Sequence, residues 1–271
     1  MTTTTSTTPT HTGRLDPPLS RAARVGTGLC LVLAGLTNGL GQYLGELLMP
    51  DLADFTAQIR WGAAHPAVHV AEQTALLVSM LVLPLGLLGL AALTRWAAPR
   101  LTAAGLLLML WGMWGFHNVV ALGYAAGVVA PGAIGTDQGA RLNEGYLDHV
   151  GTTLTALLPH LVGSFLGLLL LALAGLRGRA LPRVPLALLV VFLVWDFLLP
   201  TAGPLEPHLL LAVSLCWLGV HVLRMPQARW RNPGQEGLAT RYWPCETRPD
   251  ARRGRRCDHA GDPAGNGRAQ P

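Results

Sequence analysis

Hydrophobic residues fall along the chain in six long blocks that polar segments separate. Most blocks measure roughly 16 to 25 residues, the length that a helix needs to cross the hydrocarbon core of a bilayer. We place the predicted helices at about 27–49, 68–94, 101–124, 151–176, 184–199 and 207–224. No alternating strand pattern competes with them, and an open sheet edge cannot satisfy its backbone polar groups in lipid. The sequence therefore predicts an all-α fold, a polytopic membrane helix bundle with about six transmembrane helices.

Composition supports this class. Hydrophobic residues make up 51% of the chain and charged residues only 13%, whereas an ordinary soluble domain is less apolar and more charged. The fifth block, VPLALLVVFLVWDFLLP, is slightly short for a span. Bilayers thin locally to meet short helices, so we still expect it to cross.

The arginines predict how the helices are oriented, because the chain contains no lysine. Of its 20 arginines, 18 lie before the first block, after the last block, or in alternate connections between blocks. The remaining connections hold only Arg60 and Arg141. Since positive loops stay inside, we expect a multi-pass protein of the cytoplasmic membrane with both termini in the cytoplasm.

Two terminal segments flank the predicted membrane domain. Residues 1–26, which open MTTTTSTTPT, are Thr-rich and have nothing to pack against, so we expect disorder. No cleavage site follows a short apolar core, so the first block should stay as a helix rather than act as a cleaved signal peptide. Residues 225–271 form an Arg-rich tail in which RRGRR occupies 252–256. This tail is also expected to be disordered.

The partners that the sequence predicts are lipids. The bilayer surrounds the helices, and the arginine cluster of the tail can contact the anionic lipid of the inner leaflet. The pI near 9.5 arises from membrane topology and this tail rather than from a folded basic face, so no nucleic-acid partner is expected.

Polar and ionisable residues gather at the predicted outer ends of the helices. The segment HPAVHVAEQT at 65–74 leads directly into an uncharged apolar helix. An ionisable group that faces lipid costs about 2.5–3.5 kcal/mol on insertion scales. Such residues should therefore face one another, a water-filled cavity or the interfacial layer. Asn38, Gln42 and Glu46 also share one helical face by their spacing of four residues.

Three interpretations of these residues stay open. In the first, imidazoles and carboxylates bind a proton or a divalent metal ion for transport or sensing. The residues we would test for this site are His69, Glu72, His117, His160 and Asp196. In the second, His117 and His160 hold haem, with the aromatic residues of WGMWGFHNVV around His117. In the third, the polar groups only join helices, as in a structural or accessory subunit without a ligand.

Motifs that would raise one chemistry above the others are absent from the sequence. There is no HExxH or paired CxxC to indicate a metal site and no GxSxG to indicate a hydrolase. No residue is therefore assigned a catalytic role, and we expect a protein that is not an enzyme.

One stretch carries a family resemblance. LVLPLGLLGLAALTRWAAPRLTAAGLLLMLWGMWG, residues 81–115, resembles small uncharacterised multi-helix integral membrane proteins of GC-rich bacteria, which carry PxGLxGL, a short Arg-containing turn, and then AP and an LxxAG helix. The similarity extends loosely over residues 27–180. It implies the membrane architecture and transfers no functional residue.

Overall fold

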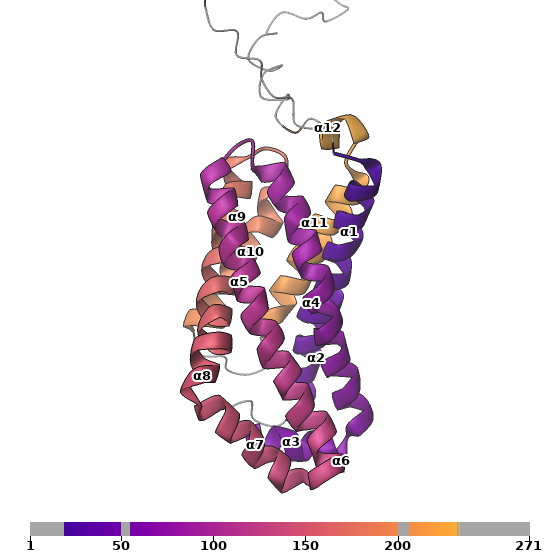
Figure 1. Ribbon diagram of the computed structural model, residues 1–271. Coiled ribbons are helices and arrows are strands. Elements are labelled where there is room, and N and C mark those ends of the chain that lie inside the picture. Colours follow the sequence, from indigo (N-terminus) through magenta and orange to yellow (C-terminus); the bar gives the residue numbers. More distant parts are fainter. Residues whose placement is uncertain (1–18, 50–54, 200–205, 232, 234–271) are drawn as a thin grey trace, which may run out of the picture. The chain divides into compact units, whose positions relative to one another are not determined.

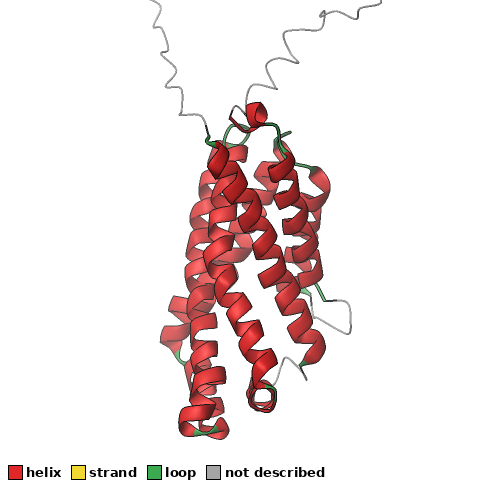
Figure 2. Cartoon of the chain, turned by 90° about the vertical axis from the view of Figure 1, so that its right-hand side faces the viewer, coloured by secondary structure: helices red, strands yellow, loops and turns green. Residues whose placement is uncertain are grey.

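The computed structural model describes residues 19–49, 55–199, 206–231 and 233. Within these residues every regular element is a helix, so the predicted all-α class is confirmed. Figure 2 shows helices joined by short loops. The predicted disorder of the chain ends falls mostly on residues 1–18 and 234–271, which lie outside the described residues.

Six helical columns form the bundle. Three are continuous runs that contain π-helical turns, and three are single α-helices. The composite columns are α1 (Arg21–Ala34) with η1 (Gly35–Leu40) and α2 (Gly41–Leu48), α5 (Pro99–Tyr124) with η2 (Ala125–Val129) and α6 (Ala130–Ile134), and α8 (Val150–Thr152) with η3 (Thr153–Leu157), η4 (Pro159–Ser164) and α9 (Phe165–Arg177). The single helices are α4 (Pro66–Thr94), α10 (Arg183–Leu198) and α11 (His208–Arg224).

The columns pack in a closed ring that follows the chain. α1 contacts α4, α4 contacts α5, α5 contacts α9, α9 contacts α10, α10 contacts α11, and α11 returns to α1. The first and last columns are therefore neighbours, as Figure 1 shows. This closure brings the middle of the first column against the beginning of α11, two segments that are far apart in the sequence.

Four columns are long and apolar enough to cross a membrane. They are Arg21–Leu48, Pro66–Thr94, Pro99–Ile134 and Val150–Arg177. Large apolar side chains cover their outside, since Leu81 is 71% exposed and Leu107 is 70% exposed. Such a continuous apolar exterior is expected against lipid rather than water. The fifth and sixth predicted spans form α10 and α11, which are helices of only 16 and 17 residues.

Short helices occupy both ends of the bundle (Figure 1). At one end α3 (Phe55–Ala64) and α7 (Thr136–Asp148) contact each other, and Arg60 Nη2 lies 3.1 Å from Asp137 Oδ1. At the other end α12 (Gln227–Arg231) places Trp230 at 1% exposure. The indole Nε1 donates to Ser20 O over 2.9 Å.

These contacts correct two predicted boundaries. The first helix begins at Arg21 rather than near residue 27, because the Ser20 hydroxyl caps it by accepting from Ala23 N. The tail does not begin at residue 225, because α12 folds back and buries Trp230. The expected disorder therefore does not apply to residues 19–26 or to 225–231.

Glycines set two of the closest helix contacts. A Cβ added to Gly39 would lie 2.5 Å from Ala212 N, and one added to Gly112 would lie 2.2 Å from Ser164 N. Both positions therefore need a residue without a side chain. Helices in membranes associate through such close packing, because lipid offers no hydrophobic driving force between them.

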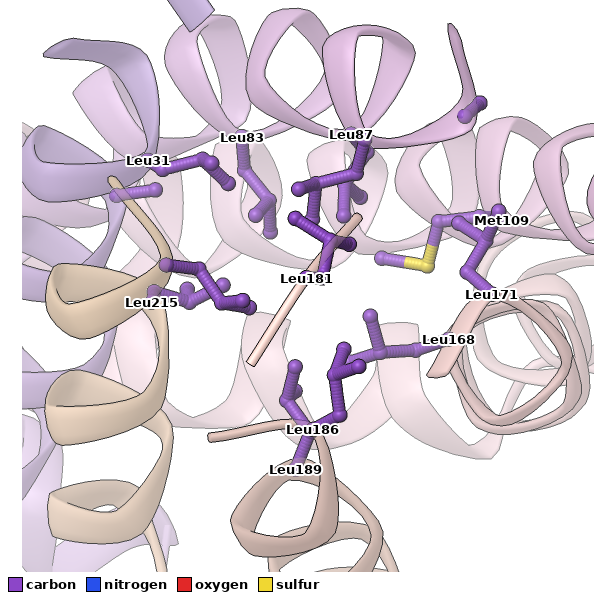
Figure 3. Packing of buried hydrophobic residues seen from close by; sticks show 14 of the residues in the cluster. Leu31, Leu83, Leu87, Met109, Leu168, Leu171, Leu181, Leu186, Leu189 and Leu215 are labelled. Carbon is purple, nitrogen blue, oxygen red and sulfur yellow. The ribbon is translucent and has the colours of Figure 1, made fainter. Parts of the chain in front are cut away.

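Leucines from five columns and Met109 of α5 fill the interior (Figure 3). Leu31, Leu87, Leu171, Leu189 and Leu215 are each at most 4% exposed. Near the last residues of α10 and the first residues of α11, polar side chains replace this apolar packing. The candidate site lies at this transition.

Candidate functional site

Glu206 and His208 form the centre of a polar cluster at the start of α11. His208 N donates to Glu206 Oε2 over 2.9 Å, and His208 Nδ1 lies 3.0 Å from the same oxygen. The local sequence Glu206-Pro207-His208 explains this pair, because an acidic group just before a helix accepts from its unpaired N–H groups. The side chains of Glu206 and His208 are only 7% and 10% exposed.

Two further carboxyl groups reach His208 from other columns. Glu46 of α2 places Oε1 3.9 Å from His208 Nδ1, and Asp196 of α10 places Oδ1 3.9 Å from His208 Nε2. We call Glu46, Asp196, Glu206 and His208 the carboxylate cluster. Its members come from three columns and from the residues just before α11, so the closed ring of helices brings them together.

The cluster carries more negative than positive charge. Three carboxyl groups surround one imidazole, and the main charges that act on them are those of each other and of His208. One oxygen each of Glu46 and Glu206 and a ring nitrogen of His208 lie within 4.8 Å of one another. Two buried carboxyl groups this close favour a state in which one of them holds a proton, because their like charges oppose the ionisation of both. The pair therefore forms a site for a proton.

The surroundings of Glu206 favour its ionised form. Burial acts to raise its pKa, but hydrogen bonds with His208 and Glu46 and the positive charge of His208 outweigh burial. Together they lower the pKa of Glu206 from its ordinary 4.5 to about 2. Glu206 is thus the member of the carboxyl pair that stays ionised.

A cavity of about 230 Å³ opens beside the cluster, inside the ring of helices. Asp196 and His208 form part of its wall, together with polar residues of the first and fourth columns. Those residues are Asn38, Gln42, His160 and Ser164. His160 Nδ1 lies 3.3 Å from Ser164 Oγ, and the His160 ring stacks on Phe116 at 4.4 Å.

A chain of hydrogen bonds fixes the wall on the side of the first column. Gln42 Nε2 donates to Asn38 Oδ1 over 2.9 Å, and Asn38 Nδ2 donates to Ser79 Oγ of α4 over 3.2 Å. Asn38 is only 3% exposed. These bonds tie the first column to α4 at the level of the cavity.

π-helical turns occur in two of the segments that line this cavity. Each accommodates an additional residue in the helical ladder and so changes the direction in which the following side chains point. Asn38 lies within η1, and His160 and Ser164 lie within η4. π-bulges occur often at functional sites.

His69 and Glu72 form a second, adjoining group on α4. His69 Nδ1 lies 3.7 Å from Glu72 Oε2, and the two side chains are 9% and 11% exposed. The Glu72 carboxyl packs against α2, since a Cβ added to Gly45 would lie 2.4 Å from Glu72 Oε1. Glu72 is therefore close enough to Glu46 for their charges to interact.

His69 lines two further cavities, of about 350 and 180 Å³. It lies between two glycines, because a Cβ on Gly62 would be 2.8 Å from His69 Cδ2 and one on Gly127 would be 2.9 Å from Nε2. Among the described residues, neither ring nitrogen has a hydrogen-bond partner. His69 is thus a buried imidazole in the wall of both cavities.

The structure groups the predicted site residues unevenly. His160 and Asp196 line one cavity, and His69 and Glu72 form a pair. His117 is exposed on α5 and lines none of the three cavities described above. The predicted convergence of all five residues is therefore not seen, because His117 lies on the outer face of the helix, one residue after Phe116, which faces the cavity.

This geometry does not favour haem. His117 and His160, the two histidines named as possible haem ligands, do not share a cavity, so they cannot hold one haem between them there. The cavity beside His160 measures about 230 Å³, which is below the roughly 300–1,000 Å³ of sites for drug-sized ligands. A porphyrin needs more space than that.

Sequence reasoning underrated Glu46, Glu206 and His208. From the sequence, Glu206 and His208 are expected to be helix-end residues in interfacial water, and Glu46 is only one member of a helical stripe. The usable signal was the acidic residue two positions before a histidine at a helix start. Comparisons of the chain with protein-family models, curated proteins and solved structures find no match. The function must therefore be inferred from the cluster itself.

Proposed function

We propose that this chain is a multi-pass protein of the cytoplasmic membrane that binds a proton at the carboxylate cluster for transport or sensing. The observation that carries the proposal is the close approach of Glu46, Glu206 and His208, with Asp196 on the other side of the imidazole. A membrane-embedded ionisable group usually marks a pathway for ions or protons, because burying it is unfavourable. Here four such groups meet.

The proposed topology has six crossings, with α10 and α11 as the fifth and sixth. At about 1.5 Å per residue, each of these helices is about 24–26 Å long, which is close to the thickness of a hydrocarbon core that thins locally. The arginine distribution supports cytoplasmic termini. In this arrangement the carboxylate cluster lies near the outer interface, where protons can reach it through water.

A proton could pass through the cluster in short steps. A proton on the Glu46–Glu206 pair is within reach of His208, and His208 Nε2 faces Asp196 at the wall of the cavity. Imidazole suits such a relay because it can accept a proton at one nitrogen and release one from the other. Glu72 adjoins Glu46 on the opposite side and connects the cluster to His69.

Infrared difference spectroscopy of the reconstituted protein tests this proposal. A protonated carboxyl group gives a carbonyl band that an ionised one lacks, so a change to alkaline buffer should remove a band in the parent protein. We expect Glu46→Gln to abolish that band. Asp137→Asn is the matched control, because Asp137 is 68% exposed and pairs with Arg60 outside the cluster. An unchanged band in Glu46→Gln would overturn the proposal.

A divalent cation is the second candidate ligand. One ligand atom each from Glu46, Glu206 and His208 lies within 4.8 Å of the others, a spacing that a small movement would close around an ion. Carboxylate and imidazole ligands suit Zn²⁺ and Mn²⁺. Metal analysis of protein purified without chelators separates the two candidates. Stoichiometric metal that Glu46→Gln and His208→Ala both remove would favour the metal site.

A further inference from the structure

The cavity beside the carboxylate cluster has Asp196 and His208 at one end, and apolar side chains form most of the rest of its wall beside the polar residues named above. On α10 Phe192 precedes Asp196 by about one turn, and on α11 Leu211 and Leu215 lie about one and two turns inside His208. Both helices thus carry their polar residue at their connected ends. A ligand that fits must combine one polar or charged group with an apolar body.

Aromatic rings from two columns surround this space. Phe116 of α5 and Phe192 and Phe197 of α10 all line it. The Phe192 ring meets the His208 ring at 5.5 Å, and the His160 ring lies between Phe116 and Phe197 at 4.4 and 6.3 Å. The face of an aromatic ring attracts a cation, and such cages recognise quaternary ammonium groups.

The charge at the polar end also favours a cation. Asp196 forms that end with His208, and the Glu46–Glu206 pair lies directly behind. Since three carboxyl groups face one imidazole, a bound cation reduces the excess of negative charge, whereas an anion adds to it. The cavity is therefore unsuited to carboxylates and phosphates.

Size and wall chemistry narrow the class further. A volume of about 230 Å³ admits an ion of only a few carbon atoms. A metal ion that enters this part of the cavity must replace its hydration shell with protein ligands. Phe116, Met113 and Leu193 offer it no oxygen or nitrogen atom from their side chains. An alkylated ammonium ion instead presents methyl or methylene groups to the apolar wall.

We propose that this cavity binds a small alkylammonium ion, with its charged nitrogen toward Asp196 and its alkyl groups against Phe116, Phe192 and Phe197. The inference rests on the proposed function, because it assumes the same net negative charge of the carboxylate cluster. It extends that function by naming the class of solute whose binding would accompany proton binding at the adjacent carboxyl pair.

Equilibrium dialysis of the full-length protein in detergent tests the inference with radiolabelled choline as the probe. The neutral competitor is 3,3-dimethylbutan-1-ol, which has the shape of choline without its charge. We expect saturable choline binding that the alcohol displaces roughly tenfold less well than unlabelled choline does. Asp196→Asn and Phe116→Leu should each weaken binding at least several-fold. Phe165→Leu is the matched control, because Phe165 contacts Phe197 at 5.4 Å but does not line the cavity.

The outcomes separate this inference from the proposed function. If choline does not bind although the thermal unfolding of the protein is cooperative, or if the alcohol competes equally well, the cavity is not an alkylammonium site. If Asp196→Asn fails to fold, the comparison of Phe116→Leu with Phe165→Leu decides, and equal affinity in both contradicts the inference. The infrared band of the Glu46–Glu206 pair, measured on the same samples, shows independently whether proton binding persists.

Discussion

His208 is joined to Glu206 twice, through its backbone N at 2.9 Å and its ring Nδ1 at 3.0 Å from the same carboxylate oxygen. The two residues are separated only by Pro207, so the bond is local and forms as α11 begins. It fixes the orientation of the imidazole and leaves Nε2 facing Asp196. One short segment thereby orients the centre of the cluster.

This bond predicts a dependence of stability on acid. The pKa of Glu206 is depressed in the folded protein, so its contribution to the free energy of unfolding is complete above pH 4.5 and lost as pH falls toward about 2. We expect Glu206→Gln to lose about 1.5–3 kcal/mol at neutral pH. The variant should also show a flatter decline between those two pH values. Unfolding in detergent followed across that range measures both effects, and equal declines in parent and variant would refute the assignment.

The contact between α5 and η4 predicts opposite effects of two identical substitutions. Gly112→Ala should destabilise the protein by about 1–3 kcal/mol, because the new Cβ would lie 2.2 Å from Ser164 N. Gly123→Ala, on the same helix, meets nothing within 4 Å. It should be neutral or stabilising, since alanine favours helix. Thermal unfolding of both variants is the measurement, and a similar loss in both would contradict the close packing.

The buried amide of Asn38 predicts a specific loss. Asn38→Ala removes the bonds to Ser79 and Gln42, so the free energy of unfolding should fall by about 1–3 kcal/mol. Thr37→Ala is the control, because the neighbouring Thr37 is exposed and bonds only within its own helix. Denaturant titration should separate the two variants. A loss of stability in Thr37→Ala as large as that in Asn38→Ala would contradict a specific stabilising role for the hydrogen bonds of Asn38.

The packing of Trp230 predicts where the chain can be shortened. Trp230→Ala should lower the free energy of unfolding by about 3–5 kcal/mol, whereas Trp217→Ala should change it little because Trp217 is 46% exposed. A chain that ends after residue 233 should keep the stability of the parent. A chain that ends after residue 225 should behave like Trp230→Ala in thermal unfolding. Full stability of the shorter chain would show that α12 contributes nothing.

The proposed orientation predicts a labelling pattern in intact cells. A cysteine placed at Gly145, which is exposed on α7, should react with a membrane-impermeant maleimide added from outside. Cys245 and Cys257 of the tail should remain unlabelled until the membrane is permeabilised. Labelling of the tail from outside would reverse the assignment of the two faces.

The sequence predicts the helices well because their apolar blocks are a local property. Each of the six blocks corresponds to a helical column. The short helices α3 and α7 were not predicted, because they are too polar to appear as apolar blocks and are held by contacts such as Arg60 with Asp137. The members of the site could be predicted only in part. His160 and Asp196 line one cavity because the column of α9 and the helix α10 are ring neighbours, and the order of helices around a ring cannot be read from hydropathy.

The register of the first column depends on one additional residue. The π turn at Gly35–Leu40 accommodates a residue that an α-helical ladder would not hold. Deleting one residue from this turn would let the ladder close normally and would rotate everything after it by about 100° while shortening the column by about 1.5 Å. Gln42 and Glu46 would then face away from His208, toward lipid. An insertion or deletion in this turn would therefore rotate the rest of the helix about its axis. It would separate the members of the carboxylate cluster without altering any residue that belongs to it.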